Sequence, residues 1–148
     1  MRIALGADHA GIHLKAEIRK LLDERGIEYK DFGTETDASV DYPDFASTVA
    51  HAVVGGGFDR GLLFCGSGIG MAMAANKIAG IRAASAGDET SARLSREHND
   101  ANVLALGERL TGPDLARKIV NTFLDTPFGG GRHQRRVDKI AALDKHTP

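Results

Sequence analysis

Apolar residues follow two alternating patterns along this chain. Short runs of consecutive apolar residues, typical of buried strands, alternate with longer segments in which apolar residues recur every three or four positions, as in amphipathic helices. The short runs predict strands at residues 2–6, 27–32, 61–64, 81–85 and 102–106.

The longer segments predict a helix after each of these strands. Gly26 is a natural end for the first helix, and Pro43 suits the first turn of the second, which the glycines at residues 55–57 terminate. The predicted helices cover residues 12–22, 41–54, 71–77, 88–97, 113–124 and 132–143, and a polar tail follows the last.

Strands that alternate with helices imply a parallel sheet covered on both faces. We therefore predict an α/β fold, a Rossmann-like three-layer sandwich around a five-stranded parallel sheet. No repeat, low-complexity tract or linker divides the chain, so we expect one domain over residues 1–148. In such sheets, functional sites lie at the carboxyl ends of the strands.

Composition excludes several classes of protein. A formal net charge of -1 gives no electrostatic footprint for nucleic acid or an anionic membrane. No stretch approaches the roughly 20 apolar residues of a membrane span, and the N-terminal apolar run is too short for a signal peptide. The single Cys cannot form an internal disulfide and fits a reducing compartment. We expect a cytoplasmic protein without nucleic-acid or membrane partners.

The densest local signal follows the third predicted strand, where Cys65 leads into a glycine-rich segment, residues 66–70, which we call the glycine loop. Alternating glycines let the backbone turn sharply, and successive amides at a helix start form a nest for anions. A thiol beside such a nest is suited to act as a base or nucleophile. A structural turn with a buried Cys fits the spacing equally well.

Familiar motifs do not match the glycine loop. No Gly-Lys-Ser/Thr follows it, as a P-loop requires, and its third glycine comes one residue early for a dinucleotide fingerprint. Met71 stands where a cysteine phosphatase needs Arg, and the CxxC spacing of redox sites is absent. His9 and His13 are four apart, but Ala10 replaces the Glu of a zinc protease, so we expect no metal site.

Polar residues elsewhere offer further candidates, each with a structural alternative. Asp8 and His9 follow the first strand and suit hydroxyl or phosphate binding, although an N-cap with a surface His would look the same. His98 and Asn99 end a helix, where His serves as an acid or base and Asn as a cap.

Arginines supply the candidates for anion binding. Arg132 and Arg136 are four apart and share one helix face, which suits bidentate contacts to a phosphate. Arg109, after the fifth strand, is another candidate. A solvated basic surface is the alternative for all three.

Together, five segments resemble ribose-5-phosphate isomerase B and its relatives, among them galactose-6-phosphate isomerase subunits and allose-6-phosphate isomerases. The matching segments are GADHAG, DYPDFA, CGSGIGMAMAANKIAGIRAA, SREHNDANVLALGERL and GGRHQRRV. They agree in order and spacing, and the resemblance extends over residues 3–143.

The resemblance implies an aldose-ketose isomerase of a sugar phosphate that moves a proton between C1 and C2 through an enediolate, without cofactor or metal. The family's thiol base falls on Cys65, although some members use a Glu elsewhere, and its ring-opening His falls on His98. The anion-stabilising loop falls on Gly66, Ser67, Gly68, Ile69 and Gly70. The other substrate contacts fall on Asp8, His9, Asn99, Arg109, Arg132 and Arg136.

The resemblance also implies a homo-oligomer, a dimer or a tetramer, in which each site combines Cys65 of one chain with His98 of another. Ribose 5-phosphate is the expected substrate, interconverted with ribulose 5-phosphate as in the pentose phosphate pathway. The alternatives are a six-carbon aldose 6-phosphate of the allose or galactose type, a non-catalytic phosphosugar-binding domain, a thiol hydrolase, and one chain of a heteromeric enzyme.

Overall fold

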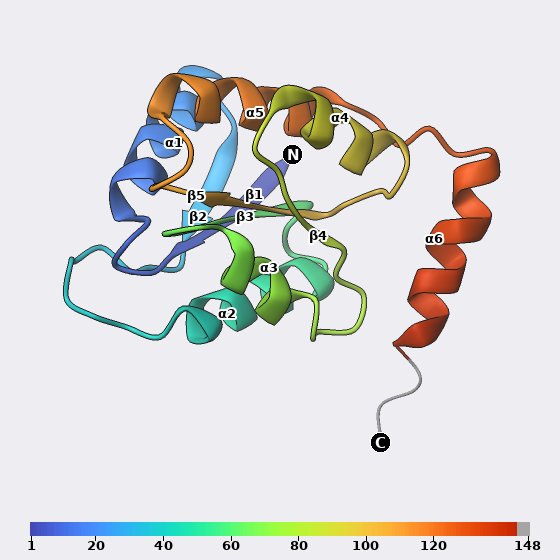
Figure 1. The fold of residues 1–148 in the computed structure, drawn as a ribbon, viewed down its shortest axis with the longest axis horizontal. Helices are drawn as coiled ribbons and strands as arrows, with labels where there is room; N and C mark the ends of the chain where they lie inside the picture. Colours follow the sequence, from blue (N-terminus) through green and yellow to red (C-terminus); the bar gives the residue numbers. More distant parts are fainter. Residues whose placement is uncertain (145–148) are drawn as a thin grey trace.

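A five-stranded, all-parallel sheet forms the centre of the molecule, in a computed structural model that describes residues 1–144. The strand order is β2-β1-β3-β5-β4, which confirms the predicted α/β, Rossmann-like architecture (Figure 1). The strands are β1 (Arg2–Ala7), β2 (Glu28–Asp31), β3 (Arg60–Cys65), β4 (Ala83–Ser85) and β5 (Val103–Gly107).

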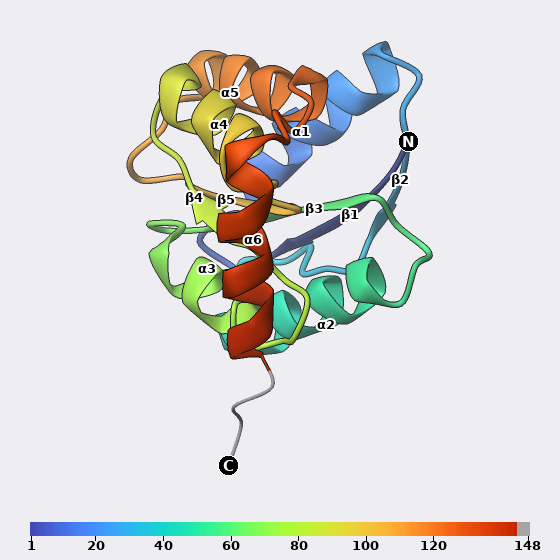
Figure 2. The ribbon, with the colours of Figure 1, turned by 90° about the vertical axis from the view of Figure 1, so that its right-hand side faces the viewer.

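Helices cover both faces of the sheet. In Figure 1, α1, α4 and α5 lie above the sheet, and α2 and α3 lie below it. The last helix, α6, stands beside the two layers, as the turned view of Figure 2 also shows. The bounds are α1 (Ile12–Glu24), α2 (Tyr42–Val54), α3 (Ile69–Ala75), α4 (Glu89–Glu97), α5 (Pro113–Asp125) and α6 (Arg132–Leu143).

The alternation of side chains along each strand divides the core in two. Leu62 and Phe64 of β3 point into the cluster under α1, α4 and α5, whereas Leu63 and Cys65 point into the cluster under α2 and α3. Cys65 is therefore the last inward-facing residue of its strand on the α2/α3 face. Its side chain lies where that core meets the carboxyl edge of the sheet.

The strand order brings three loops to one edge of the sheet. β3 lies between β1 and β5, with Ala7 opposite Phe64 and Cys65 opposite Gly107. Because parallel strands share a direction, the segments after β1, β3 and β5 emerge side by side. The candidates Asp8, Cys65 and Arg109 thus come together although they are far apart in sequence.

Most element boundaries differ from the prediction by one or two residues, and two of these differences have a clear local cause. The helix expected at residues 71–77 begins earlier, as α3, because Gly68 adopts a φ of 78° and starts the helix directly. The glycine loop is thus shorter than predicted, and Ile69 and Gly70 belong to the first helical turn.

Strand β4 is shorter than the predicted 81–85. Asn76 donates from its amide to the Ala83 carbonyl and accepts from the Ala83 amide, at 2.9 and 2.7 Å between the heavy atoms. The Arg82 amide donates to the side chain of Asn102. Side chains from other segments therefore take the place of a neighbouring strand here.

Helix α6 matches the predicted range, and the predicted polar tail beyond it falls largely on residues 145–148, outside the described residues. Of the helices within residues 1–144, none has the length and apolar character that crossing a membrane requires.

Candidate active site

A pocket of about 530 Å³ opens where β1, β3 and β5 end. Eight residues predicted from the sequence line it, together with four that were not. The lining consists of Asp8, His9, Ala10, Tyr42, Cys65, Gly66, Ser67, Ile69, Gly70, Met73, Arg109 and Leu110.

The thiol of Cys65 lies at the floor of this pocket. Its side chain is buried, and the Gly68 amide donates a hydrogen bond to Sγ over 3.0 Å. This hydrogen bond joins the sulfur to the turn that starts α3 and fixes the thiol beside the pocket.

Gly68 is required for this arrangement. Its φ of 78° lies in the left-handed region, and a Cβ there would lie 2.9 Å from the backbone carbon of Leu106. Only glycine can adopt this positive φ and also fit against Leu106 without a shift of the chain. Gly68 does not line the pocket but supplies the amide behind the sulfur.

Asp8 and His9 form the wall that follows β1. The Asp8 carboxylate is almost fully buried and accepts a hydrogen bond from the Ala10 amide at 2.9 Å. The Nδ1 atom of His9 accepts from the Val40 amide at 3.2 Å. A backbone amide can only donate, so the proton of the neutral imidazole sits on Nε2, where it is available as a donor to a ligand.

Arg109 brings positive charge to the pocket. Its amide donates to the Gly66 carbonyl at 3.1 Å, and its guanidinium packs over Gly66. Within residues 1–144, the guanidinium forms neither an ion pair nor a hydrogen bond. An exposed guanidinium that no protein group neutralises is suited to bind a phosphate.

Besides Gly68, four predicted site residues lie outside this pocket: His98, Asn99, Arg132 and Arg136. His98 follows the last turn of α4, and its ring stacks on that of His133 with 4.3 Å between the ring centroids. Arg132 and Arg136 both lie in α6, four residues apart, and both are exposed. One chain therefore holds two separate groups of candidate residues.

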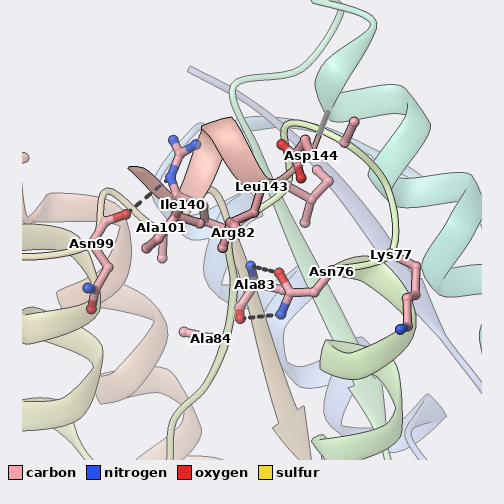
Figure 3. Close-up of a pocket in the computed structure, with 12 residues that line it drawn as sticks. Asn76, Lys77, Arg82, Ala83, Ala84, Asn99, Ala101, Ile140, Leu143 and Asp144 are labelled. Carbon is pink, nitrogen blue, oxygen red and sulfur yellow. Dashed lines mark hydrogen bonds between the residues drawn. The ribbon is translucent and has the colours of Figure 1, made fainter. Parts of the chain in front are cut away.

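Asn99 lines a different cavity, a groove of about 580 Å³ between β4 and α6 (Figure 3). Its carbonyl accepts a hydrogen bond from Arg82 Nε at 3.1 Å. Ile140 and Leu143 form the α6 side of this groove and are exposed.

Apolar residues that the sequence analysis did not select surround the mouth of the Cys65 pocket. Met73 is 65% exposed and Leu110 69% exposed, and Tyr42 closes one side. The DYPDFA segment contains Tyr42 and was the available signal for it. Nothing in the local sequence marks Met73 or Leu110, because their exposure depends on the packing of distant segments.

Within residues 1–144, no group of three or more His, Cys, Asp and Glu side chains is arranged to hold a metal ion. The Cys65 pocket presents a thiol, a carboxylate, an imidazole, a guanidinium and the glycine loop.

Comparisons with known proteins show the family to which this chain is similar. The family model described as ribose/galactose isomerase matches residues 3–140. The chain is 54% identical to a putative sugar phosphate isomerase of Bacillus subtilis over 98% of both chains. It is 51% identical to ribose-5-phosphate isomerase B of Escherichia coli over 97% of both. A solved ribose-5-phosphate isomerase B from Clostridium thermocellum superposes with a TM-score of 0.97 at 55% identity, with 98% of each chain covered.

Proposed function

This chain belongs to the ribose/galactose isomerase family and is an aldose-ketose isomerase of sugar phosphates, and we propose that it interconverts ribose 5-phosphate and ribulose 5-phosphate with Cys65 as the base. The observation that carries the proposal is the buried Cys65 thiol, hydrogen-bonded by the Gly68 amide at the floor of the pocket. The names of the relatives support the five-carbon substrate.

The phosphate binds to the cationic side of the pocket. In this chain, the Nε2–H of His9 and the Arg109 guanidinium are the available donors. Arg132 and Arg136 of a second copy complete the phosphate site. Binding energy from this non-reacting end of the substrate holds the sugar carbons against Cys65 and offsets the cost of orienting them.

The thiolate of Cys65 takes the proton from C2 of the open-chain aldose and returns it to C1, and the hydroxyl proton on O2 passes to O1 as the C2 carbonyl forms. The electrons of the broken C–H bond form the C1–C2 double bond of an enediolate, whose oxygen carries the negative charge. We assign stabilisation of that oxygen to amides of the glycine loop, where one such donor is typically worth about 2.7–4 kcal/mol in the transition state.

His98 opens the furanose by accepting the proton of the anomeric hydroxyl while the C1–O4 bond breaks, and the protonated imidazole then returns a proton to O4. Because His98, Asn99, Arg132 and Arg136 lie outside the Cys65 pocket of their own chain, we assign them to the site of a second copy. The exposed apolar residues around the pocket mouth give that copy a surface to cover. The working enzyme is thus at least a homodimer.

Incubation of the purified protein with ribose 5-phosphate, followed by ketose formation, tests the proposal. Cys65→Ala removes the base and should abolish turnover while leaving the melting temperature close to that of the wild type. Allose 6-phosphate is the matched substrate with one more CHOH unit.

Each outcome has a distinct meaning. Ribose 5-phosphate turnover that survives in Cys65→Ala would contradict the role of the thiol. Turnover of allose 6-phosphate alone would keep the chemistry and replace the substrate. Binding of both sugars without turnover of either would contradict the proposed reaction and favour a binding domain.

A further inference from the structure

The stacked imidazoles of His98 and His133 join α4 to α6. The two ring planes are 16° from parallel, with 4.3 Å between centroids. Among the described residues, no hydrogen bond is made by the ring of His98. The contact with His133 is therefore what orients the ring of the proposed ring-opening residue.

Helix α6 is positioned to hold this stack. The Gly129 amide donates to the Glu97 carbonyl at 2.9 Å, which ties the segment before α6 to the end of α4. Val137 is the buried residue of α6 and lies four positions after His133, so the two side chains share the face that meets the body. His133 thus sits on the anchored face of an otherwise exposed helix.

The surroundings of the stack favour the neutral form of His133. The pKa of His133 is lowered, first because its surroundings strip water from the ring, and then because His98, Arg132 and Arg136 repel a further positive charge. Glu97 opposes this shift. A neutral His133 places no positive charge on the ring of His98, which must be neutral to accept a proton.

We propose that His133 is a positioning residue for ring opening, holding the His98 imidazole in the plane from which it accepts the anomeric proton. The inference rests on the proposed function. It is specific to one step, because the later proton transfer between C2 and C1 belongs to Cys65 in a different group of residues. Loss of the stack should slow the formation of the open-chain aldose and leave the thiol chemistry intact.

Two substitutions separate stacking from other roles of His133. His133→Ala removes the ring, whereas His133→Phe keeps a flat ring over His98 without an ionisable group. For His133→Ala we expect a fall in kcat/KM of about tenfold, a part of the 10²–10⁴-fold that a positioned acid or base usually contributes. In His133→Phe, most of the lost kcat/KM should be restored.

A kinetic isotope effect identifies the step that has slowed. Ribose 5-phosphate carrying deuterium at C2 slows the thiol step only, so the isotope effect on kcat/KM shrinks when ring opening becomes more rate-limiting. We expect an effect in His133→Ala that is no larger than in the wild type and lies close to 1. Arg136→Gln is the control, because weaker phosphate binding should raise KM without reducing the isotope effect.

The outcomes are distinguishable. A lower rate with an undiminished isotope effect above 1 in His133→Ala would overturn the proposal, since binding or the thiol step would then be damaged. An unchanged rate, or no rescue by His133→Phe, would overturn it as well. A wild type that does not turn over ribose 5-phosphate would instead refute the proposed function.

Discussion

At the residue scale, the proposed chemistry depends on one amide and one sulfur. Cys65 is buried, yet it ends a strand at the edge of the sheet and so borders the pocket. The Gly68 amide reaches its sulfur because residue 68 turns the chain into α3 with a left-handed backbone. The hydrogen bond to Cys65 consequently depends on the left-handed conformation of Gly68.

Gly68→Ala tests this link. A Cβ in the left-handed region costs roughly 1–2 kcal/mol, and here it would also press on the backbone of Leu106. A shifted amide loses a hydrogen bond to a charged group worth about 1.5–3 kcal/mol, so kcat should fall about 10- to 100-fold. Steady-state kinetics and thermal melting measure the two effects.

Gly26→Ala is the matched control for Gly68→Ala. Gly26 also has a positive φ, of 66°, but a Cβ there would meet nothing within 4 Å. The Gly26→Ala variant should melt at a lower temperature than the wild type and keep its kcat and KM. Equal losses of activity in both variants would contradict a specific role for the Gly68 amide.

At the scale of elements, α1 is capped by a residue distant in sequence. Glu108, just after β5, accepts a hydrogen bond from the Leu14 amide at 2.7 Å through Oε1. Leu14 lies in the first turn of α1, whose own preceding residue, Gly11, offers no side-chain cap. The carboxylate thus satisfies a free helix amide and faces the positive end of the helix dipole.

Glu108→Ala should lower the free energy of unfolding by about 1 kcal/mol, as the loss of a cap usually does. For a chain of this size, that corresponds to roughly 2–4 °C in melting temperature. Glu108→Gln keeps an acceptor oxygen, so its free energy of unfolding should fall by less. If the two variants melt together at the wild-type temperature, the cap contributes nothing to stability.

At the scale of the whole molecule, the candidate residues form two groups that one chain does not unite. Cys65, Asp8 and Arg109 meet at the ends of three strands, whereas His98 and the arginines of α6 lie elsewhere. A two-fold symmetric dimer in which each pocket faces the partner's α6 would produce two complete sites from two incomplete chains.

Complementation between inactive variants tests this arrangement. When Cys65→Ala and His98→Asn chains are mixed and reassembled, half of the dimers are mixed and each holds one intact site. Random pairing should then restore about a quarter of the wild-type activity. Activity of the mixture is compared with that of each parent treated alone.

Cys65→Ala mixed with Asp8→Asn is the control for complementation. These two residues belong to the same pocket, so no mixed dimer contains an intact site and no activity should return. Recovery in neither mixture, or full activity in a monomer at high dilution, would show that a single chain supplies the whole site.

Much of this protein was determined by the sequence alone. The spacing of apolar residues is a local property, and it gave the order of the strands and helices and the parallel sheet. The segment after β3 marked the Cys65 pocket for the same reason, since the thiol and its amide donor are three residues apart. The start of β4 was less well predicted, because the Arg82 amide pairs with the side chain of Asn102 and not with a strand.

Only the tertiary structure decided which distant residues meet. The order β2-β1-β3-β5-β4 places Arg109 beside Gly66 and Glu108 at the start of α1, and no local pattern encodes these contacts. Tertiary structure also separated His98 from Cys65 and stacked it on His133. The physical reason is that such contacts depend on how whole elements pack across the sheet, whereas the sequence pattern reports only which face of each element is buried.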